Sequence, residues 1–249
     1  MVNIKGRYIL ITGAANGIGK GIAESFGKTG DLVFITDNDI GKGKKVASDI
    51  IRNGGKAEFF YLDVSEIDSI GNVVAAIISK YKKIDVLVNN AGICPTEPFD
   101  RIDLDQWDHV IRTNLTSAFF LIKETSKYMI ERRYGKIINI SSVSAKMGGV
   151  TAPPHYVASK GGLDSLTRYF AKNLAKFNIN VNAVSCATTK TNLIKSWEKS
   201  IIEYLLTITP LNRMSTVSDI ANAVIFLASD NASFITGEVL NVNGGLYMD

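Results

Sequence analysis

Short apolar runs alternate along the chain with longer segments whose apolar positions recur at helical spacing. The runs are rich in β-branched residues and nearly continuous, which is typical of parallel strands buried on both faces. The sequence therefore predicts a parallel sheet. The expected strands are residues 8–12, 32–36, 57–64, 84–90, 136–141, 179–185 and 239–243.

The intervening segments carry the spacing of helices that connect these strands. Alternation of strands and helices is typical of a doubly wound α/β fold with helices on both faces of the sheet. No internal repeat or flexible linker divides the chain, so we expect one Rossmann-like α/β domain over residues 1–249. The expected helices are residues 17–30, 41–53, 66–80, 104–133, 156–176 and 217–229.

The composition is that of an ordinary globular protein. Of 249 residues, 46% are hydrophobic and 21% are charged, which argues against disorder. No apolar run reaches the roughly 18 residues that a membrane span requires. Glycines interrupt the apolar run 8–15, so it reads as a strand and not as a signal peptide. We expect a cytoplasmic protein without a membrane partner.

The charge distribution and the placement of cysteine and histidine argue against nucleic-acid binding and metal binding. The net charge is +4, and the densest basic cluster, residues 42–45, is short and has acidic neighbours. We interpret it as a solvated helix face, so no nucleic-acid partner is expected. Cys94, Cys186, His109 and His155 are too scattered for a recognisable metal site, so no metal is expected.

A glycine-rich turn follows the first expected strand. Residues 12–19, TGAANGIG, place Gly13, Gly17 and Gly19 between that strand and a helix. Such glycines let backbone N–H groups and the helix N-terminus approach a pyrophosphate, because no side chain stands in the way. The spacing differs from G-x-G-x-x-G, so the turn alone leaves a dinucleotide site and a purely structural turn as alternatives.

The second expected strand ends near an acidic residue. Asp37 follows the first glycine at about the interval at which dinucleotide-binding folds place the carboxylate that binds the adenosine ribose. An exposed turn aspartate is the alternative. A carboxylate facing the 2′ position would repel a 2′-phosphate, and the neighbouring Asn16 and Asn38 are uncharged. NAD is therefore favoured over NADP.

A tyrosine and a lysine lie four positions apart in HYVASK, residues 155–160. On a helix, Tyr156 and Lys160 would share a face one turn apart. A nearby cation lowers the pKa of a phenol from about 10 towards the working pH, which suits the phenol to move protons. Taken alone, the pair is more typical of an ordinary surface helix.

Several short motifs occur in one order and at consistent intervals. They are TGAANGIG at 12–19, LDV at 62–64, NNAG at 89–92, Asn114 in RTNLTSAF, NISS at 139–142, YVASK at 156–160 and VNGG at 242–245. Together they resemble the short-chain dehydrogenase/reductase family, and especially its 3-oxoacyl-reductase-like members. The resemblance covers almost the whole chain, and the joint occurrence of the motifs is highly specific.

The resemblance implies catalytic roles for Asn114, Ser142, Tyr156 and Lys160. Tyr156 resembles the general acid/base, and Lys160 resembles the residue that holds the nicotinamide ribose and lowers the pKa of the tyrosine. Ser142 would position the substrate oxygen, while Asn114 would hold a water in a proton relay. Beside an oxidised nicotinamide and Lys160, the pKa of Tyr156 is expected to lie well below its ordinary value.

The resemblance also implies a cofactor site. Asp63 and Val64 would contact the adenine, and Asn90 would border the ribose. Thr189 and Thr191 would meet the nicotinamide carboxamide and the phosphates. The full expected set is Gly13, Asn16, Gly17, Ile18, Gly19, Asp37, Asp63, Val64, Asn90, Ala91, Gly92, Tyr156, Lys160, Thr189 and Thr191.

The chain departs from the family pattern near the nicotinamide. Cys186 and Ala187 stand where the family usually has Pro-Gly, and losing the glycine removes backbone freedom. Cys186 is expected to be a small buried residue and not a catalytic thiol. His155 is expected on a different side of the helix from Tyr156, at the pocket mouth or in solvent.

Residues 190–212 are expected to form a mobile helical lid over a small-molecule substrate. Their mixture of apolar and charged residues does not distinguish a sugar or polyol from a hydroxyacyl thioester or a hydrophobic alcohol. The segments 104–133 and 156–175 carry more apolar and small positions than one sheet face needs. A homodimer or homotetramer is therefore expected, as the resemblance also implies.

The favoured function is an NAD-dependent oxidoreductase that interconverts a secondary alcohol and a ketone by hydride transfer. An NADPH-dependent 3-oxoacyl-[acyl carrier protein] reductase is the alternative, and it would need a phosphate-binding cation near Asp37. A non-catalytic dinucleotide-binding scaffold or regulator is a third hypothesis, because Cys186 and Ala187 depart from the family pattern.

Overall fold

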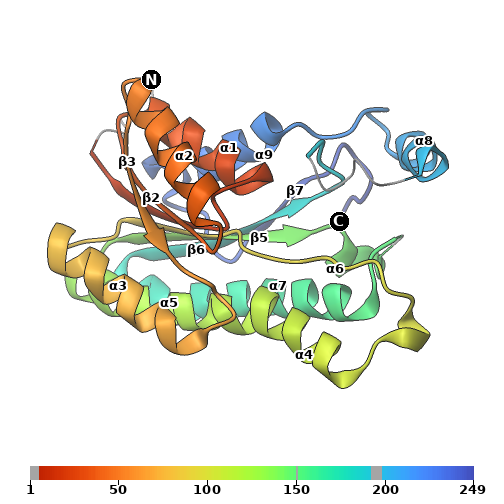
Figure 1. The fold of residues 1–249 in the computed structure, drawn as a ribbon, viewed down its shortest axis with the longest axis horizontal. Coiled ribbons are helices and arrows are strands. Elements are labelled where there is room, and N and C mark those ends of the chain that lie inside the picture. The colour runs from red at the N-terminus through yellow and green to blue at the C-terminus, as the bar shows by residue number, and fades with distance from the viewer. Residues whose placement is uncertain (1–5, 150, 192–197) are drawn as a thin grey trace.

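A computed structural model describes residues 6–149, 151–191 and 198–249 of the protein. Within this part of the chain, seven parallel strands form one sheet in the order β3-β2-β1-β4-β5-β6-β7 (Figure 1). The strands are β1 (Tyr8–Thr12), β2 (Leu32–Asp37), β3 (Lys56–Tyr61), β4 (Val86–Asn89), β5 (Gly135–Ser142), β6 (Ile179–Cys186) and β7 (Val239–Val242). The Rossmann-like α/β fold predicted from the sequence is confirmed.

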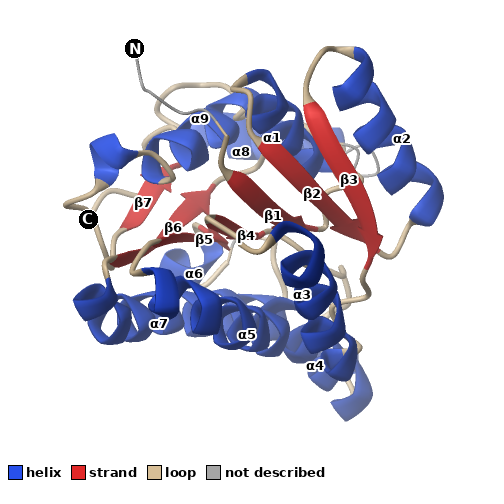
Figure 2. Cartoon of the chain, turned by 90° about the vertical axis from the view of Figure 1, so that its left-hand side faces the viewer, coloured by secondary structure: helices blue, strands red, loops and turns tan. Residues whose placement is uncertain are grey.

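Helices cover both faces of the sheet (Figures 1 and 2). One layer holds α1 (Gly17–Lys28), α2 (Ile40–Arg52) and α9 (Val217–Leu227). The other holds α3 (Ile67–Tyr81), α4 (Leu104–Ile111), α5 (Ser117–Arg132) and α7 (Pro154–Leu174). Shorter elements are η1 (Phe99–Arg101), α6 (Ser144–Met147), η3 (Ala175–Phe177), α8 (Lys199–Ile208) and η5 (Asp230–Ala232).

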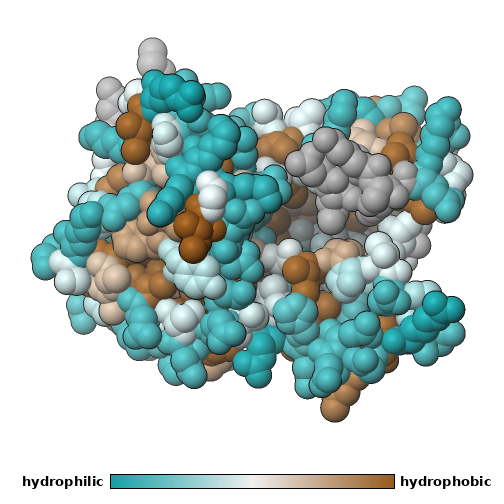
Figure 3. Space-filling view, viewed as in Figure 1, coloured by the Kyte–Doolittle hydropathy of each residue, from teal (hydrophilic) through white to brown (hydrophobic). Residues whose placement is uncertain are grey.

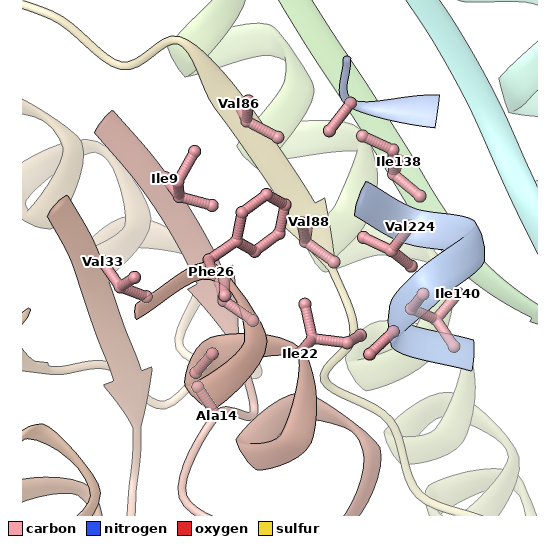
Figure 4. Close-up of a cluster of buried hydrophobic side chains, with 14 of the residues drawn as sticks. Ile9, Ala14, Ile22, Phe26, Val33, Val86, Val88, Ile138, Ile140 and Val224 are labelled. Carbon is pink, nitrogen blue, oxygen red and sulfur yellow. The ribbon is translucent and has the colours of Figure 1, made fainter. Parts of the chain in front are cut away.

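Two hydrophobic cores form because successive strand residues point to opposite faces of the sheet. Ile9 of β1 packs with Ile22 and Phe26 of α1 in one core (Figure 4). Leu10 faces the other way and packs in the second core with residues of α3, α5 and α7 such as Ile77. Burial on both faces is why the strands read as nearly continuous apolar runs.

The segment predicted as one helix, residues 104–133, contains a π-helical turn. This turn, η2 (Arg112–Thr116), joins α4 to α5, and Asn114 lies within it. A π turn inserts an extra residue into a helix and often occurs at a functional site. The apolar spacing alone did not reveal it, since the helical pattern continues on both sides.

The strand order reverses between β1 and β4, and open α/β sheets bind ligands at such a point. Thr12 joins the two strand ends, because its Oγ1 accepts hydrogen bonds from the N–H groups of Asn90 and Ala91, each at 3.1 Å. Figure 3 shows the surface hollowed between the two helix layers. None of the helices in the described residues combines the length and apolar character of a membrane span.

Candidate active site

The glycine turn after β1 brings the backbone close to the N-terminus of α1. Gly13 and Gly17 have φ angles of 62° and 50°, which favour glycine. A Cβ added to Gly19 would lie 2.2 Å from the carbonyl oxygen of Gly13, so this position has no room for a side chain. Asn16 caps the helix by accepting from the Gly17 N–H at 3.2 Å. The turn therefore fits the close approach of a pyrophosphate.

Residues from two other strand ends surround this turn. Asn90 Nδ2 donates to the carbonyl oxygens of Thr12 and Gly13, both at 2.9 Å. The side-chain N–H groups of Asn90 are thus used in hydrogen bonds to the glycine turn. A contact from Asn90 to a ribose would therefore have to use Oδ1 or the main chain. Thr191 lies beside the start of α1, since a Cβ on Gly17 would lie 3.7 Å from its methyl group.

Asp37 ends β2 beside the glycine turn. Its Oδ2 accepts from the N–H of Ala15 and its Oδ1 from the N–H of Asp39, each at 2.9 Å. The carboxylate therefore fixes the turn in addition to lying in the expected ribose region. The sequence did not indicate this second role, because Ala15 and Asp37 meet only once β1 and β2 pair.

A second carboxylate lies close to the loop that follows β2. Asp63 accepts from Asn38 Nδ2 at 3.1 Å and from the N–H of Ser65 at 2.9 Å. Burial raises the pKa of Asp63, but hydrogen bonds from Ser65 and Asn38 outweigh it and hold the pKa below its ordinary value. Both acidic residues expected at the adenosine end thus favour a negative surface. Val64 is buried in the core, which leaves little of its side chain for adenine.

Lys42 is a cation that the sequence analysis missed at this end of the site. Its Nζ lies 2.7 Å from Asp39 Oδ2, and the hydrogen bond to Asp39, with a smaller effect of the Asp37 charge, raises the pKa of Lys42. Lys42 belongs to the basic run 42–45, which the sequence predicts to be a solvated helix face, and its side chain is exposed. The short distance in sequence between Asp37 and Lys42 is the signal that would have placed this cation near the carboxylate.

The structure brings the expected catalytic residues together at the ends of β4 and β5. Lys160 Nζ lies 5.7 Å from the centre of the Tyr156 ring on α7. A Cβ on Gly92 would lie 3.2 Å from Asn114 Oδ1 and 3.5 Å from Lys160 Nζ. Ser142, the last residue of β5, accepts from the N–H of Ser144 at 3.1 Å, and its hydroxyl acts to lower the pKa of Tyr156.

The direction of the Tyr156 shift differs from the expectation. Burial raises the pKa of Tyr156 and the nearby Cys94 and Cys186 add to the rise, while the Ser142 hydroxyl opposes it. Burial also lowers the pKa of Lys160 to about 8, and its Nζ donates to the carbonyl oxygen of Ile140 at 2.8 Å. The protein alone therefore does not produce the low tyrosine pKa that the i,i+4 spacing suggested.

Asn114 uses its side chain to connect two elements of the site. Its Oδ1 accepts from the N–H of Ile93 at 2.8 Å, and its Nδ2 donates to the Ile93 carbonyl at 2.9 Å and to Ser159 Oγ at 3.1 Å. Both amide hydrogens thus have partners within the chain. A relay water would have to bind the remaining lone pair of Oδ1 or a main-chain carbonyl of the π turn.

The loop after β6 is also held by hydrogen bonds. Thr189 Oγ1 donates to the Ala187 carbonyl at 3.1 Å and lies 2.8 Å from Ser215 Oγ. Cys186 is buried in a core, as expected. Burial raises the pKa of Cys186 to about 12 and that of Cys94 to about 11, so both thiols stay protonated at neutral pH. No cluster of metal-ligating side chains occurs among the described residues.

Two further expectations concern the surroundings of the site. Of the lid 190–212, residues 192–197 lie outside the described residues, and α8 is helical as predicted. A cavity of about 640 Å³ lies between α8, the loop that follows it and the end of β7.

The expectation that His155 lies at the pocket mouth or in solvent is wrong, because the imidazole is buried near Trp107 of α4.

Comparisons with known proteins agree with this arrangement over the whole chain. A family model described as enoyl-(acyl carrier protein) reductase matches residues 13–247. The 3-oxoacyl-[acyl-carrier-protein] reductase FabG of Escherichia coli (strain K12) is 37% identical over 247 residues, which cover 99% of this chain and 100% of the relative.

Two solved structures that the chain resembles hold different nucleotides. A 3-oxoacyl-[acyl-carrier protein] reductase with bound NAD from Brucella melitensis has a TM-score of 0.91 and 32% identity, with 99% of this chain and 93% of that chain covered. A putative NAD(P)-dependent gluconate 5-dehydrogenase from Beutenbergia cavernae, with bound NADP at low occupancy, has a TM-score of 0.93 and 31% identity, with coverage of 98% and 97%.

Proposed function

Because the chain belongs to the short-chain dehydrogenase/reductase family of oxidoreductases, we propose that it interconverts a secondary alcohol and a ketone with NAD as its cofactor. Residues 1–249 act as one catalytic domain, with 190–212 as the lid. The observation that carries the proposal is the cluster of Ser142, Tyr156 and Lys160 at the strand ends next to the glycine turn.

The residues of the chain have separate tasks in this reaction. A bound nicotinamide dinucleotide supplies the hydride chemistry. The phenol oxygen of Tyr156 gives a proton to the substrate oxygen or takes one from it, and the Ser142 hydroxyl orients that oxygen. Because burial raises the pKa of Tyr156, the ammonium group of Lys160 and the positive charge of an oxidised nicotinamide would act together to favour its phenolate form.

The charges at the adenosine end support NAD over NADP. Asp37 and Asp63 lie where the adenosine is proposed to bind, and the nearby cation, Lys42 in the first turn of α2, pairs with Asp39. A 2′-phosphate would bring further negative charge next to these carboxylates. Binding NADP would require Lys42 to leave Asp39.

Replacing Asp37 by asparagine is expected to shift nucleotide preference towards NADP. Asp37→Asn keeps one oxygen for the N–H of Ala15, loses the acceptor for the N–H of Asp39 and removes one negative charge from the ribose region. We expect the ratio of KM for NADP to KM for NAD to fall about tenfold, which corresponds to about 1.4 kcal/mol. Steady-state kinetics with both nucleotides measures the ratio, and Glu131→Gln on α5 serves as a control. An unchanged ratio would argue against Asp37 as the discriminating residue.

The full-length likeness to FabG supports a second candidate, reduction of a 3-oxoacyl thioester with NADPH. Turnover should be measured with sugars, polyols, steroids and acyl thioesters, each with both nucleotides in both directions. Preference for a 3-oxoacyl thioester and NADPH would select this candidate. Nucleotide binding without turnover of any substrate would favour the third hypothesis, a non-catalytic scaffold or regulator.

Association of identical chains through α5 and α7 is part of the proposal. Phe119 of α5 and Tyr169 of α7 are 37% and 60% exposed, and Phe119 packs on Phe170 with ring centres 5.9 Å apart. Light scattering at micromolar concentration is expected to give a dimer or tetramer. Tyr169→Glu should move the mass towards the monomer, whereas Tyr204→Glu on α8 should not. A monomeric wild-type protein would contradict this proposal.

A further inference from the structure

The N-terminus of α7 is capped by a histidine inside the helix. The helix starts with Pro154, and the preceding Pro153 offers no side-chain cap. The first N–H groups of a helix have no partner within the helix. Here the N–H of Tyr156 donates to Nδ1 of His155 at 2.9 Å. The imidazole therefore satisfies the backbone of the residue that carries the reactive phenol.

The hydrogen bond also fixes the tautomer of the neutral imidazole. Since Nδ1 accepts, the neutral ring carries its hydrogen on Nε2. The His155 side chain is fully buried, and Nε2 has no hydrogen-bond partner within residues 6–149, 151–191 and 198–249. An apolar side chain would fill this space without the free-energy cost of a buried, unpaired N–H group. The hydrogen bond that Nδ1 accepts is therefore the feature that explains a histidine at this position.

We propose that His155 is a positioning residue whose neutral imidazole fixes the backbone at Tyr156, and that its protonation releases this backbone and lowers turnover at acid pH. The inference rests on the proposed acid/base role of Tyr156. An imidazolium has donors on both nitrogens, so Nδ1 could no longer accept from the N–H of Tyr156. It would also place a positive charge at the positive end of the helix dipole.

Burial lowers the pKa of His155 below its ordinary value of 6.5. Among the charged groups on the surrounding elements, Asp105, Asp108 and His109 of α4 and Arg112 of η2 are exposed, and Lys146 of α6 pairs with Asp249. On α7 itself, Lys160 donates to Ile140, and Asp164 is buried, which raises its pKa. Between the lowered pKa and 6.5 the unfolded chain binds more protons than the folded chain. The stabilisation by His155 is therefore present above about pH 6.5 and is lost as the pH falls through the lowered pKa.

Two variants of similar size separate the acceptor from the packing. His155→Asn places an amide oxygen at the position of Nδ1 and does not titrate, whereas His155→Leu has no acceptor. We expect His155→Asn to keep kcat within about threefold of the wild type near neutral pH and to lose the acid decline that His155 causes. We expect His155→Leu to lower kcat about tenfold at all pH values, with KM for NAD unchanged in both.

Calorimetric melting of the three proteins from pH 5 to 8 provides a readout that does not need turnover. The Tm of the wild type should fall more steeply below pH 6.5 than that of His155→Asn. Equal kcat values for the two variants, or an acid decline and Tm slope that persist in His155→Asn, would overturn the inference. If Tyr156→Phe kept full turnover, the proposed function would fail, while the Tm comparison would still test the bond from His155 to the Tyr156 backbone.

Discussion

Replacing Tyr156 by phenylalanine is expected to lower kcat by roughly 10²–10⁴-fold, which is the usual contribution of a positioned acid or base. The substitution removes the hydroxyl that would exchange a proton with the substrate and keeps the ring beside Lys160. The glycine turn, Asp37 and Asn90 do not depend on this hydroxyl, since their hydrogen bonds lie among themselves and the ends of β1 and β2. The Kd for NAD should therefore change by less than about threefold.

Turnover and calorimetric titration of NAD, measured on the same preparations, test this prediction. Tyr169→Phe is a matched control, because it removes a hydroxyl from an exposed tyrosine on the same helix. Its kcat should equal that of the wild type. Normal turnover in Tyr156→Phe would remove the phenol from the mechanism, and loss of NAD binding would mean that the hydroxyl serves the cofactor site instead.

The sequence predicted the sheet well because burial on both faces leaves an unmistakable apolar pattern. β1 matches its predicted span, residues 8–12. The ends of β3 and β4 do not match, since residues such as Leu62 and Ile84 are buried but lie outside the strands. An apolar residue shows that a position is buried, and strand pairing is a separate property that depends on the neighbouring backbone.

The site was predicted as a set of residues but not as a set of interactions. The motifs placed Asn114, Tyr156 and Lys160 in one centre, and the structure brings them together. They gave no sign that Asn114 connects Ile93 to Ser159, or that His155 caps α7. Such bonds depend on how elements distant in the sequence pack together, and no local spacing encodes that.

The direction of the Tyr156 shift was missed for the same reason. The i,i+4 spacing correctly placed a cation near the phenol, yet burial of the ring is the larger influence on its pKa. Burial acts on Lys160 as well, lowering its pKa to about 8. A pKa shift predicted from the neighbouring charge alone therefore has the wrong direction when desolvation of the phenol outweighs that charge.

Replacing Lys160 by methionine is expected to abolish turnover and, at the same time, to stabilise the protein. Lys160 is 4% exposed, and its pKa lies well below the ordinary 10.5. Between pH 8 and 10.5 the folded chain binds fewer protons than the unfolded chain, so stability rises with pH in that window. Below pH 8 the full cost of the buried charge is present, on the order of 3 kcal/mol.

Methionine has a similar length and no charge, so it removes this cost while losing the hydrogen bond from the ammonium group to Ile140, worth about 1.5 kcal/mol for a charged donor. Urea denaturation at pH 7 should show Lys160→Met to be more stable by roughly 1–2 kcal/mol, and the difference should shrink by pH 9.5. Lys172→Met, at an exposed position of α7, is the control and should change neither stability nor kcat. A less stable Lys160→Met protein at pH 7 would show that the ammonium group is well solvated or paired in the folded chain. A more stable protein without turnover would instead mean that Lys160 serves the reaction at a cost in folding stability, because the folded chain is more stable without the buried charge.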